Sequence, residues 1–305
     1  MEQNDRRPPP GLEQLDCAPL DDDCTVVHDA ERYREESIRN WDSVAPAWER
    51  SRPVTQETNR ELDAWLLDRL AISPGQTILE VAAGQGDTGL QAAARLQGRG
   101  RVLLADQSQG MLDGARRAAD EQGLSAVVDT AVMDAQHLDL ADESVDGVVC
   151  RFGYMLMPDP PAAIREARRV LRDGGRLAFA VWGEAERNPW ALVIGPVMNA
   201  RGLLPPPTPG EPGMFVLAGA GRLESLARGA GFEQVEVAEI PVRWRYESFD
   251  AYWDTATEMS PSMGRALRQA GSDEVAAVRA GAAERYAAAL DDGVLPGLTY
   301  AVAAR

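Results

Sequence analysis

The sequence of 305 residues contains no lysine, so all 31 of its basic residues are arginines. A catalytic tyrosine–lysine pair for hydride transfer is therefore excluded. Acidic residues number 48, which gives a formal net charge of −17. Because nucleic acids and anionic membranes attract proteins mainly through Lys and Arg, neither is an expected partner.

Cysteine is scarce as well. Cys17, Cys24 and Cys150 form no CxxC pair and lack the spacing of a metal site, so no bound metal is expected. This usage is typical of a reducing compartment and predicts a cytoplasmic protein. No apolar run reaches the roughly 20 residues that span a bilayer. Residues 1–10 are too polar for a secretory signal.

The chain is predicted to begin with a disordered leader and a helical cap. Residues 1–28 carry PPP and DDD runs and almost no apolar periodicity, which predicts the leader. Residues 29–72 contain two helical patterns, which predict the cap. Pro46 is expected to break or kink the first of these helices.

Residues 73–305 are predicted to form one domain in which strands alternate with amphipathic helices. The expected strands are 77–82, 101–105, 126–133, 145–152, 176–182, a run around 240–246, and 298–304. The expected helices between them are 86–96, 108–122, one with Ile164, Ala167, Val170 and Leu171 on one side, and 222–228. This alternation predicts an α/β fold with a Rossmann-like, doubly wound, mostly parallel seven-stranded sheet.

Two insertions interrupt the alternation and are predicted to form a lid over the acceptor. Residues 183–219 contain NPW and PPPTPGEPG, too rich in proline for a plain connector. They are expected to be mobile and to close over a bound ligand. Residues 248–292 are predicted to be helical, with a stripe that runs from Val275 to Leu290.

A glycine-rich segment follows the first strand and opens the next helix. Gly84, Gly86 and Gly89 match G-x-G-x-x-G, the dinucleotide fingerprint, although a tight turn without a ligand can carry the same pattern. Charge separates the possible ligands. Glu80 and Asp87 would repel a pyrophosphate by roughly 4 kcal/mol at about 4 Å, whereas S-adenosylmethionine is cationic there. The turn therefore favours S-adenosylmethionine over NAD(P).

Acidic residues end three consecutive predicted strands, at Glu80, Asp106 and Asp134. The carboxyl ends of parallel strands line one crevice where the strand order reverses, so the three are expected near one pocket. Asp106 would hold a ribose, and Asp134 would accept a hydrogen bond from an adenine amino group. A solvated loop residue is the alternative for each acid alone.

Several motifs together resemble a class I S-adenosylmethionine-dependent methyltransferase. They are the segment 80–87, Asp106, Met133-Asp134-Ala135 and the segment 169–175. The chain is most similar to the branch typified by the ubiquinone/menaquinone-biosynthesis C-methyltransferases (methyltransferase type 11). The common class I pattern has glycine at the position of Ala82, but this branch resembles the chain in carrying alanine. The resemblance spans about residues 38–183.

The resemblance implies S-adenosyl-L-methionine as cofactor and a set of residues that bind it. Gly84, Gln85 and Gly86 would approach the methionine moiety, with Glu80 and Ala82 beside them. The other implied contacts are Asp106 to the ribose, Gln107 and Met111 flanking the adenine, Asp134 and Ala135 at its edge, and Arg151 facing the methyl donor. Tyr33 and Trp41 are expected either to contact the cofactor from the lid or to be packed aromatics.

Aromatic and methionine residues in and around the insertions predict a small, apolar or aromatic acceptor. They are Trp190, Met198, Met214, Phe215, Trp244, Tyr246, Phe249, Tyr252, Trp253, Met259 and Met263. Ordinary core packing is the alternative for most of them. The acceptor atom, whether carbon, oxygen or nitrogen, is left open, and so is the oligomeric state.

Catalysis is expected to rest on holding donor and acceptor in line, because good positioning alone provides effective molarities on the order of 10⁵ M or more. His137 is a weak candidate for a general base, and His28 in the leader is expected to be solvated. Two alternatives remain: an NAD(P)-dependent oxidoreductase, and a protein that binds S-adenosylmethionine without catalysis.

Overall fold

The computed structural model describes residues 30–208 and 210–305. The predicted leader, residues 1–28, lies outside the described residues, together with Cys17, Cys24 and His28. Most of what the sequence analysis predicted for the sheet and the site falls within the described part.

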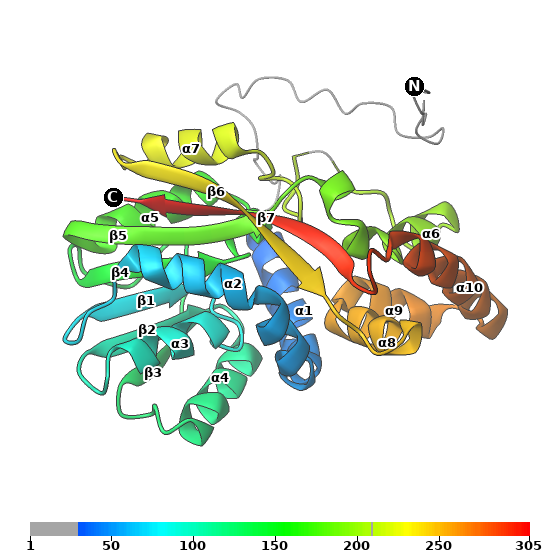
Figure 1. The fold of residues 1–305 in the computed structure, drawn as a ribbon, viewed down its shortest axis with the longest axis horizontal. Coiled ribbons are helices and arrows are strands. Elements are labelled where there is room, and N and C mark those ends of the chain that lie inside the picture. The colour runs from blue at the N-terminus through cyan, green and yellow to red at the C-terminus, as the bar shows by residue number, and fades with distance from the viewer. Residues whose placement is uncertain (1–29, 209) are drawn as a thin grey trace.

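A single seven-stranded sheet with the strand order β3-β2-β1-β4-β5-β7-β6 forms the centre of the described chain (Figure 1). Its strands are β1 (Thr77–Val81), β2 (Arg101–Asp106), β3 (Val128–Val132), β4 (Val145–Arg151), β5 (Leu171–Trp182), β6 (Val235–Trp244) and β7 (Leu295–Ala304). Strands β1 to β5 pair in parallel, and β7 pairs antiparallel with both β5 and β6. The order reverses between β1 and β4, which is where a doubly wound sheet opens a crevice at its carboxyl edge.

Helices cover both faces of the sheet, as the α/β prediction requires. The described helices are α1 (Ala30–Arg50), α2 (Arg52–Leu70), α3 (Asp87–Arg95), α4 (Gln109–Glu121), α5 (Pro160–Val170), α6 (Gly195–Ala200), α7 (Ala220–Gly229), α8 (Phe249–Met259), α9 (Pro261–Gln269) and α10 (Ser272–Ala289). Side chains of α2, α3 and α4 share one core cluster, and those of α5 and α7 share the other.

The two core clusters meet across the sheet because successive side chains of a strand point to opposite faces. In β1, Ile78 packs into the cluster with α2 and α3, whereas Leu79 and Val81 pack into the cluster with α5. All three are at most 1% exposed. A strand buried on both faces reads as a continuous apolar run, which is how the sequence predicted β1.

Four of the described helices, α4, α5, α8 and α9, begin where short polar side chains cap them. Ser108 accepts a hydrogen bond from the backbone N–H of Met111 at the start of α4, and Ser248 does the same for α8. At α5 the cap is Asp159, followed by Pro160 in the first turn. Caps of this kind satisfy backbone donors that a helix start leaves free.

Of the two predicted effects of Pro46, a break or a kink, the break does not occur, since α1 runs through it from Ala30 to Arg50. The neighbouring Val44, Ala45 and Ala47 are buried, so tertiary packing outweighs the lost backbone hydrogen bond. The chain instead breaks at Ser51, just before a proline in the first turn of α2.

Strand β5 begins at Leu171, earlier than the predicted residue 176. Leu171 is therefore buried as a strand residue and does not belong to the face of α5. At the other boundaries, β6 ends at Trp244, so Tyr246 lies beyond it, and β7 begins at Leu295.

The second insertion contains α8, α9 and α10 and not one long helix. Val278, Ala282 and Tyr286 of the predicted stripe are buried, but Leu290 follows the end of α10 and is 37% exposed. In Figure 1 these helices lie together with α6 at one end of the sheet.

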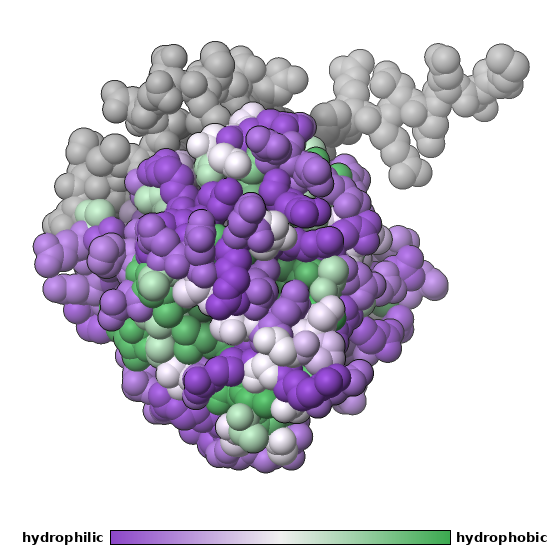
Figure 2. All heavy atoms as spheres, turned by 90° about the vertical axis from the view of Figure 1, so that its left-hand side faces the viewer, coloured by the Kyte–Doolittle hydropathy of each residue, from purple (hydrophilic) through white to green (hydrophobic). Residues whose placement is uncertain are grey.

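Charged and polar side chains dominate the face shown in Figure 2, with smaller hydrophobic areas between them. None of the helices in residues 30–208 and 210–305 is long and apolar enough to cross a membrane. The same residues contain no group of three or more His, Cys, Asp and Glu side chains suited to a metal ion.

Candidate active site

The glycine turn joins β1 to α3 and depends on glycine at each position of the motif. Gly84 and Gly86 have φ values of +53° and +75°, a region that favours glycine. A Cβ at Gly86 would lie 2.7 Å from Cδ1 of Leu104. At Gly89 it would lie 2.3 Å from Cδ2 of Leu104 and 2.5 Å from Oε2 of Glu80. The last two glycines therefore let α3 approach the sheet.

Ala82 also has a positive φ, +50°, which explains why glycine is common at this position in class I enzymes. Its side chain fits because Gly153 lies opposite, where an added Cβ would be only 2.5 Å from that of Ala82. The alanine is thus accommodated by a glycine that follows β4.

Asp106, at the end of β2, connects the glycine turn to the start of α4 through hydrogen bonds. Its Oδ2 accepts the backbone N–H of Gly84 at 2.8 Å, and its Oδ1 accepts that of Ser108 at 2.8 Å. Burial raises the pKa of this carboxyl although the backbone hydrogen bonds oppose the shift. Asp106 lines the cavity described below.

Glu80 lies deeper than the sequence suggested. The side chain is only 2% exposed, and its Oε2 accepts the backbone N–H of Gly89 at 2.7 Å. Burial raises the pKa of Glu80 to about 8, although the nearby Arg151 guanidinium and the Gly89 N–H act in the opposite direction. Glu80 is therefore mostly protonated at neutral pH, and its expected role as a fixed negative charge must be corrected.

Buried ion pairs surround the turn. Nη1 of Arg151 lies 2.7 Å from Oδ2 of Asp63, whose side chain is fully buried, and Nη2 lies 3.6 Å from Oδ2 of Asp87. Nε of Arg52 lies 3.0 Å from Oδ1 of Asp87. The guanidinium of Arg151 thus pairs with α2, while its side chain still lines the cavity. Arg52 and Asp63 were missed in the sequence, because nothing there signals that α2 packs beside the turn.

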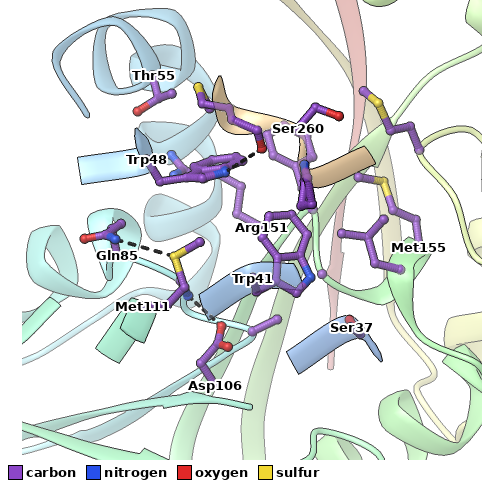
Figure 3. Close-up of a pocket in the computed structure, with 18 of the residues that line it drawn as sticks. Ser37, Trp41, Trp48, Thr55, Gln85, Asp106, Met111, Arg151, Met155 and Ser260 are labelled. Carbon is purple, nitrogen blue, oxygen red and sulfur yellow. Dashed lines mark hydrogen bonds between the residues drawn. The ribbon is translucent and has the colours of Figure 1, made fainter. Parts of the chain in front are cut away.

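One cavity of about 410 Å³ runs along this edge of the sheet. Of the residues predicted to contact a cofactor, those that line it are Glu80, Ala82, Gly84, Gln85, Asp106, Gln107, Met111, Ala135 and Arg151. Figure 3 shows Gln85, Met111 and Asp106 on one side of Trp41, and Met155 on the other. The amide of Gln85 donates to the backbone oxygen of Ala45 and approaches Sδ of Met111 at 3.4 Å.

Gly86 and Asp134 are not among the lining residues. Gly86 is enclosed by Leu104 and α4. Oδ2 of Asp134 lies 3.0 Å from Nε of Arg34 in α1, and its Oδ1 accepts the backbone N–H of Gln136. The Asp134 carboxylate is therefore engaged by the cap in this structure and is not presented to the cavity.

His137 is exposed and is not among the residues that line the cavity. Its backbone closes a short turn with Asp134. At this position the imidazole does not contact the site, which argues against a role for His137 as a general base.

The other end of the cavity is aromatic and is called the acceptor chamber below. Predicted acceptor residues that line it are Trp190, Met214, Trp244, Tyr246, Tyr252, Met259 and Met263. Met198, Phe215, Phe249 and Trp253 are not among the lining residues and pack into the core instead. The sequence analysis did not assign Phe152 and Trp182 to the site, yet both line the chamber with parallel rings 4.1 Å apart.

Helix α1 closes the cavity along one side. The Tyr33 hydroxyl donates to the backbone oxygen of Leu156 at 3.0 Å, and Nε1 of Trp48 donates to that of Met259 at 3.1 Å. Tyr33, Trp41 and Trp48 all line the cavity. The two tryptophans contact edge to face with ring centres 5.8 Å apart. These aromatics are thus both packed together and exposed to the cavity.

Comparison with known proteins identifies the family of the central segment. Residues 78–175 match the family model described as a methyltransferase domain. The chain carries a methyltransferase domain. This domain begins in β1 and ends within β5, so it includes the glycine turn, Asp106 and Arg151. The family resemblance inferred from the sequence is confirmed.

A curated relative covers a similar part of the chain. The ubiquinone/menaquinone biosynthesis C-methyltransferase of Acidiphilium cryptum is 38% identical over 135 residues. The aligned region is 42% of this chain and 53% of that protein. The chain therefore spans about half the length of this relative, and the likeness is concentrated in the methyltransferase domain.

Solved structures resemble a larger part of the chain. The (4+2)-cyclase SpnF has a TM-score of 0.57 at 20% identity, covering 89% of this chain and 96% of that one. Phosphoethanolamine N-methyltransferase 2 of Haemonchus contortus, solved with phosphomonomethylethanolamine and S-adenosylhomocysteine, has a TM-score of 0.55 at 18% identity, covering 89% and 60%. At these identities the likeness shows the fold alone, and it confirms the predicted fold class.

Proposed function

We propose that this protein transfers a methyl group from S-adenosylmethionine to a small apolar or aromatic acceptor. The observation that carries the proposal is that one cavity is bordered at one end by the glycine turn of the methyltransferase domain and at the other by the acceptor chamber. Such a cavity would bring a donor and an acceptor within reach of each other.

The residues at the glycine turn fit this cofactor. A Cβ at Gly84 would meet no atom within 4 Å, so the backbone there borders open space. Asp106 would accept hydrogen bonds from ribose hydroxyls, and Gln107, Met111 and Ala135 would border the adenine. When bound, S-adenosylmethionine supplies a methyl group activated by its sulfonium.

The charges around the turn support S-adenosylmethionine over NAD(P). Asp106 lines the cavity and is held by backbone N–H groups and not by a basic side chain, so its carboxylate would repel a pyrophosphate. The guanidiniums of Arg52 and Arg151 do not reverse this preference, because both are paired with buried carboxylates. The absence of lysine from the whole sequence removes a tyrosine–lysine hydride site as well.

The residues of the cavity act by positioning and by excluding water. Each lining carboxylate is already bonded: Glu80 to Gly89, Asp106 to Gly84 and Ser108, and Asp87 to Arg52. The one histidine in the described residues is exposed. We therefore propose transfer without a dedicated general base, to an acceptor whose nucleophilic atom is already available.

The domain organisation follows from this proposal. Residues 29–72 would cap the cofactor, and the insertions 183–219 and 248–292 would cover the acceptor. The acceptor chamber draws Trp190 and Met214 from the first insertion, and Tyr252 and Met263 from the second. Both insertions thus contribute walls to one apolar space, which suits an acceptor with little charge.

Calorimetry with S-adenosylhomocysteine and with NAD tests the cofactor, and release of S-adenosylhomocysteine during incubation with a panel of aromatic C-, O- and N-nucleophiles tests the reaction. We expect S-adenosylhomocysteine to bind, NAD not to bind, and at least one acceptor to be methylated. Binding of NAD alone would replace the proposal with the oxidoreductase. Binding of S-adenosylhomocysteine without turnover on any acceptor would support the non-catalytic alternative.

A further inference from the structure

The acceptor chamber is apolar except for a few polar atoms, and two of its side-chain donors are already hydrogen-bonded. The Tyr252 hydroxyl donates to the backbone oxygen of Trp190 at 2.8 Å. Nε1 of Trp190 donates to Oδ1 of Asn188 at 3.1 Å. These groups hold the wall together and have no donor left for a ligand.

Besides the hydroxyl of Thr255 in α8, two donors on aromatic rings of the chamber have no partner among residues 30–208 and 210–305. They are the indole N–H of Trp182, at the carboxyl end of β5, and the hydroxyl of Tyr246, in the segment between β6 and α8. Both residues line the cavity, and Trp182 is only 5% exposed. The indole N–H of Trp244 is also unpaired, but protein atoms enclose it completely, which is not the case for the other two.

Both groups are uncharged hydrogen-bond donors. An indole N–H is only a donor. The Tyr246 phenol keeps its proton, because burial and the nearby Tyr286 raise its pKa above the ordinary value. The rings are fixed by their neighbours: Trp182 stacks on Phe152, and Tyr246 lies parallel to Trp244 with ring centres 6.2 Å apart. A ligand would therefore meet donors in set positions.

An unpaired donor in an apolar space is costly unless a ligand or water accepts its hydrogen, since the missing hydrogen bond outweighs small gains in contact. We propose that Trp182 and Tyr246 are the positioning residues for the acceptor, and that the acceptor is a planar molecule with a carbonyl, phenolic or enolic oxygen that accepts their hydrogens. This inference rests on the proposed function, because it concerns the chamber to which that function assigns the acceptor.

Such contacts would select among apolar molecules of equal shape. A chamber without free donors would favour a hydrocarbon over its ketone, because the ketone oxygen would lose its hydrogen bonds to water and gain none in the chamber. With two donors available, the ketone regains its hydrogen bonds on binding. The hydrogen bonds would also fix the orientation of the ring relative to the methyl donor.

The test uses α-tetralone and tetralin, two bicyclic probes of nearly equal shape of which only the first carries a carbonyl. Dissociation constants are measured by quenching of tryptophan fluorescence in the presence of S-adenosylhomocysteine, for the wild type, Tyr246→Phe and Trp182→Phe. We expect each substitution to shift the ratio of the two constants towards tetralin by about three- to tenfold. The ratio removes any general loss of packing, which would weaken both probes.

Tyr286→Phe is the matched control. It removes the same hydroxyl from a neighbouring tyrosine that is 8% exposed and is not among the residues lining the cavity, so the ratio should not change. An unchanged ratio in both Tyr246→Phe and Trp182→Phe, or no binding of α-tetralone to the wild type, overturns the inference. Failure of S-adenosylhomocysteine itself to bind would overturn the proposed function instead, which separates the two.

Discussion

The burial of Glu80 predicts how the free energy of unfolding depends on pH. The carboxyl has a pKa of about 8 in the folded chain, against 4.5 for an ordinary glutamate. Between these pH values the Glu80 carboxyl is ionised in the unfolded chain, so it must take up a proton when the chain folds. The free energy of unfolding therefore falls by up to about 1.4 kcal/mol per pH unit as the pH rises through this window.

The substitution Glu80→Gln removes this titration and keeps an oxygen that can accept the backbone N–H of Gly89. From pH 5 to pH 7, the free energy of unfolding of the variant should rise relative to that of the wild type by roughly 2–3 kcal/mol. The assay is urea denaturation of both proteins at pH 5, 6 and 7 without added ligand. A loss of packing in the variant would change its free energy of unfolding by the same amount at each pH, so it is separated from the effect of the titration.

Glu166→Gln is the control, because the hydrogen bond from Arg169 lowers the pKa of Glu166. That carboxyl is ionised in the folded and the unfolded chain between pH 5 and 7, so its substitution should cost the same at each pH. If Glu80→Gln also differs from the wild type by a constant amount, Glu80 is ionised in the folded protein. The reasoning from burial would then be refuted.

Four further substitutions test the site. Asp106→Ala should weaken the binding of S-adenosylhomocysteine by about tenfold or more in calorimetry, because the ribose loses its charged acceptor; an unchanged dissociation constant in a folded variant would remove this assignment. Arg151→Met should lower the free energy of unfolding by roughly 3–5 kcal/mol, because it leaves the carboxylate of Asp63 buried without its partner; chemical denaturation would show a smaller loss if Asp63 simply becomes protonated. Trp190→Ala should impair acceptor turnover far more than binding of S-adenosylhomocysteine. Phe215→Ala should impair turnover less, because Phe215 is not among the lining residues. Equal effects of the two substitutions in a turnover assay would contradict the assigned chamber.

The alternation of strands and helices was predictable because each buried strand leaves a local signature in the sequence. The glycine turn and Asp106 were predictable for the same reason, since a motif of adjacent residues fixes their geometry. The boundaries of helices and strands were less predictable. Leu171 would suit a helix face and a strand equally well, and only its pairing with Val145 assigns it to β5.

Contacts between distant segments could not be predicted. Asp134 is correctly placed after β3, but its partner Arg34 lies about a hundred positions earlier, in α1. The depth of Glu80 depends on how α3 packs over β1, which the local sequence does not contain. Similarly, Met198 and Phe215 share the composition of the chamber residues, and only the orientation of their elements directs them into the core.

Helix α1 connects the two halves of the cavity. Asp42 accepts hydrogen bonds from Ser108 and from the backbone of Gly110 at the start of α4, while Trp48 donates to the end of α8. A ligand in either half of the cavity would therefore border the same helix. By thermodynamic reciprocity, any factor by which the cofactor raises acceptor affinity must equal the factor by which the acceptor raises cofactor affinity. Because α1 contacts both halves, it is the first segment in which to seek substitutions that change both affinities by the same factor.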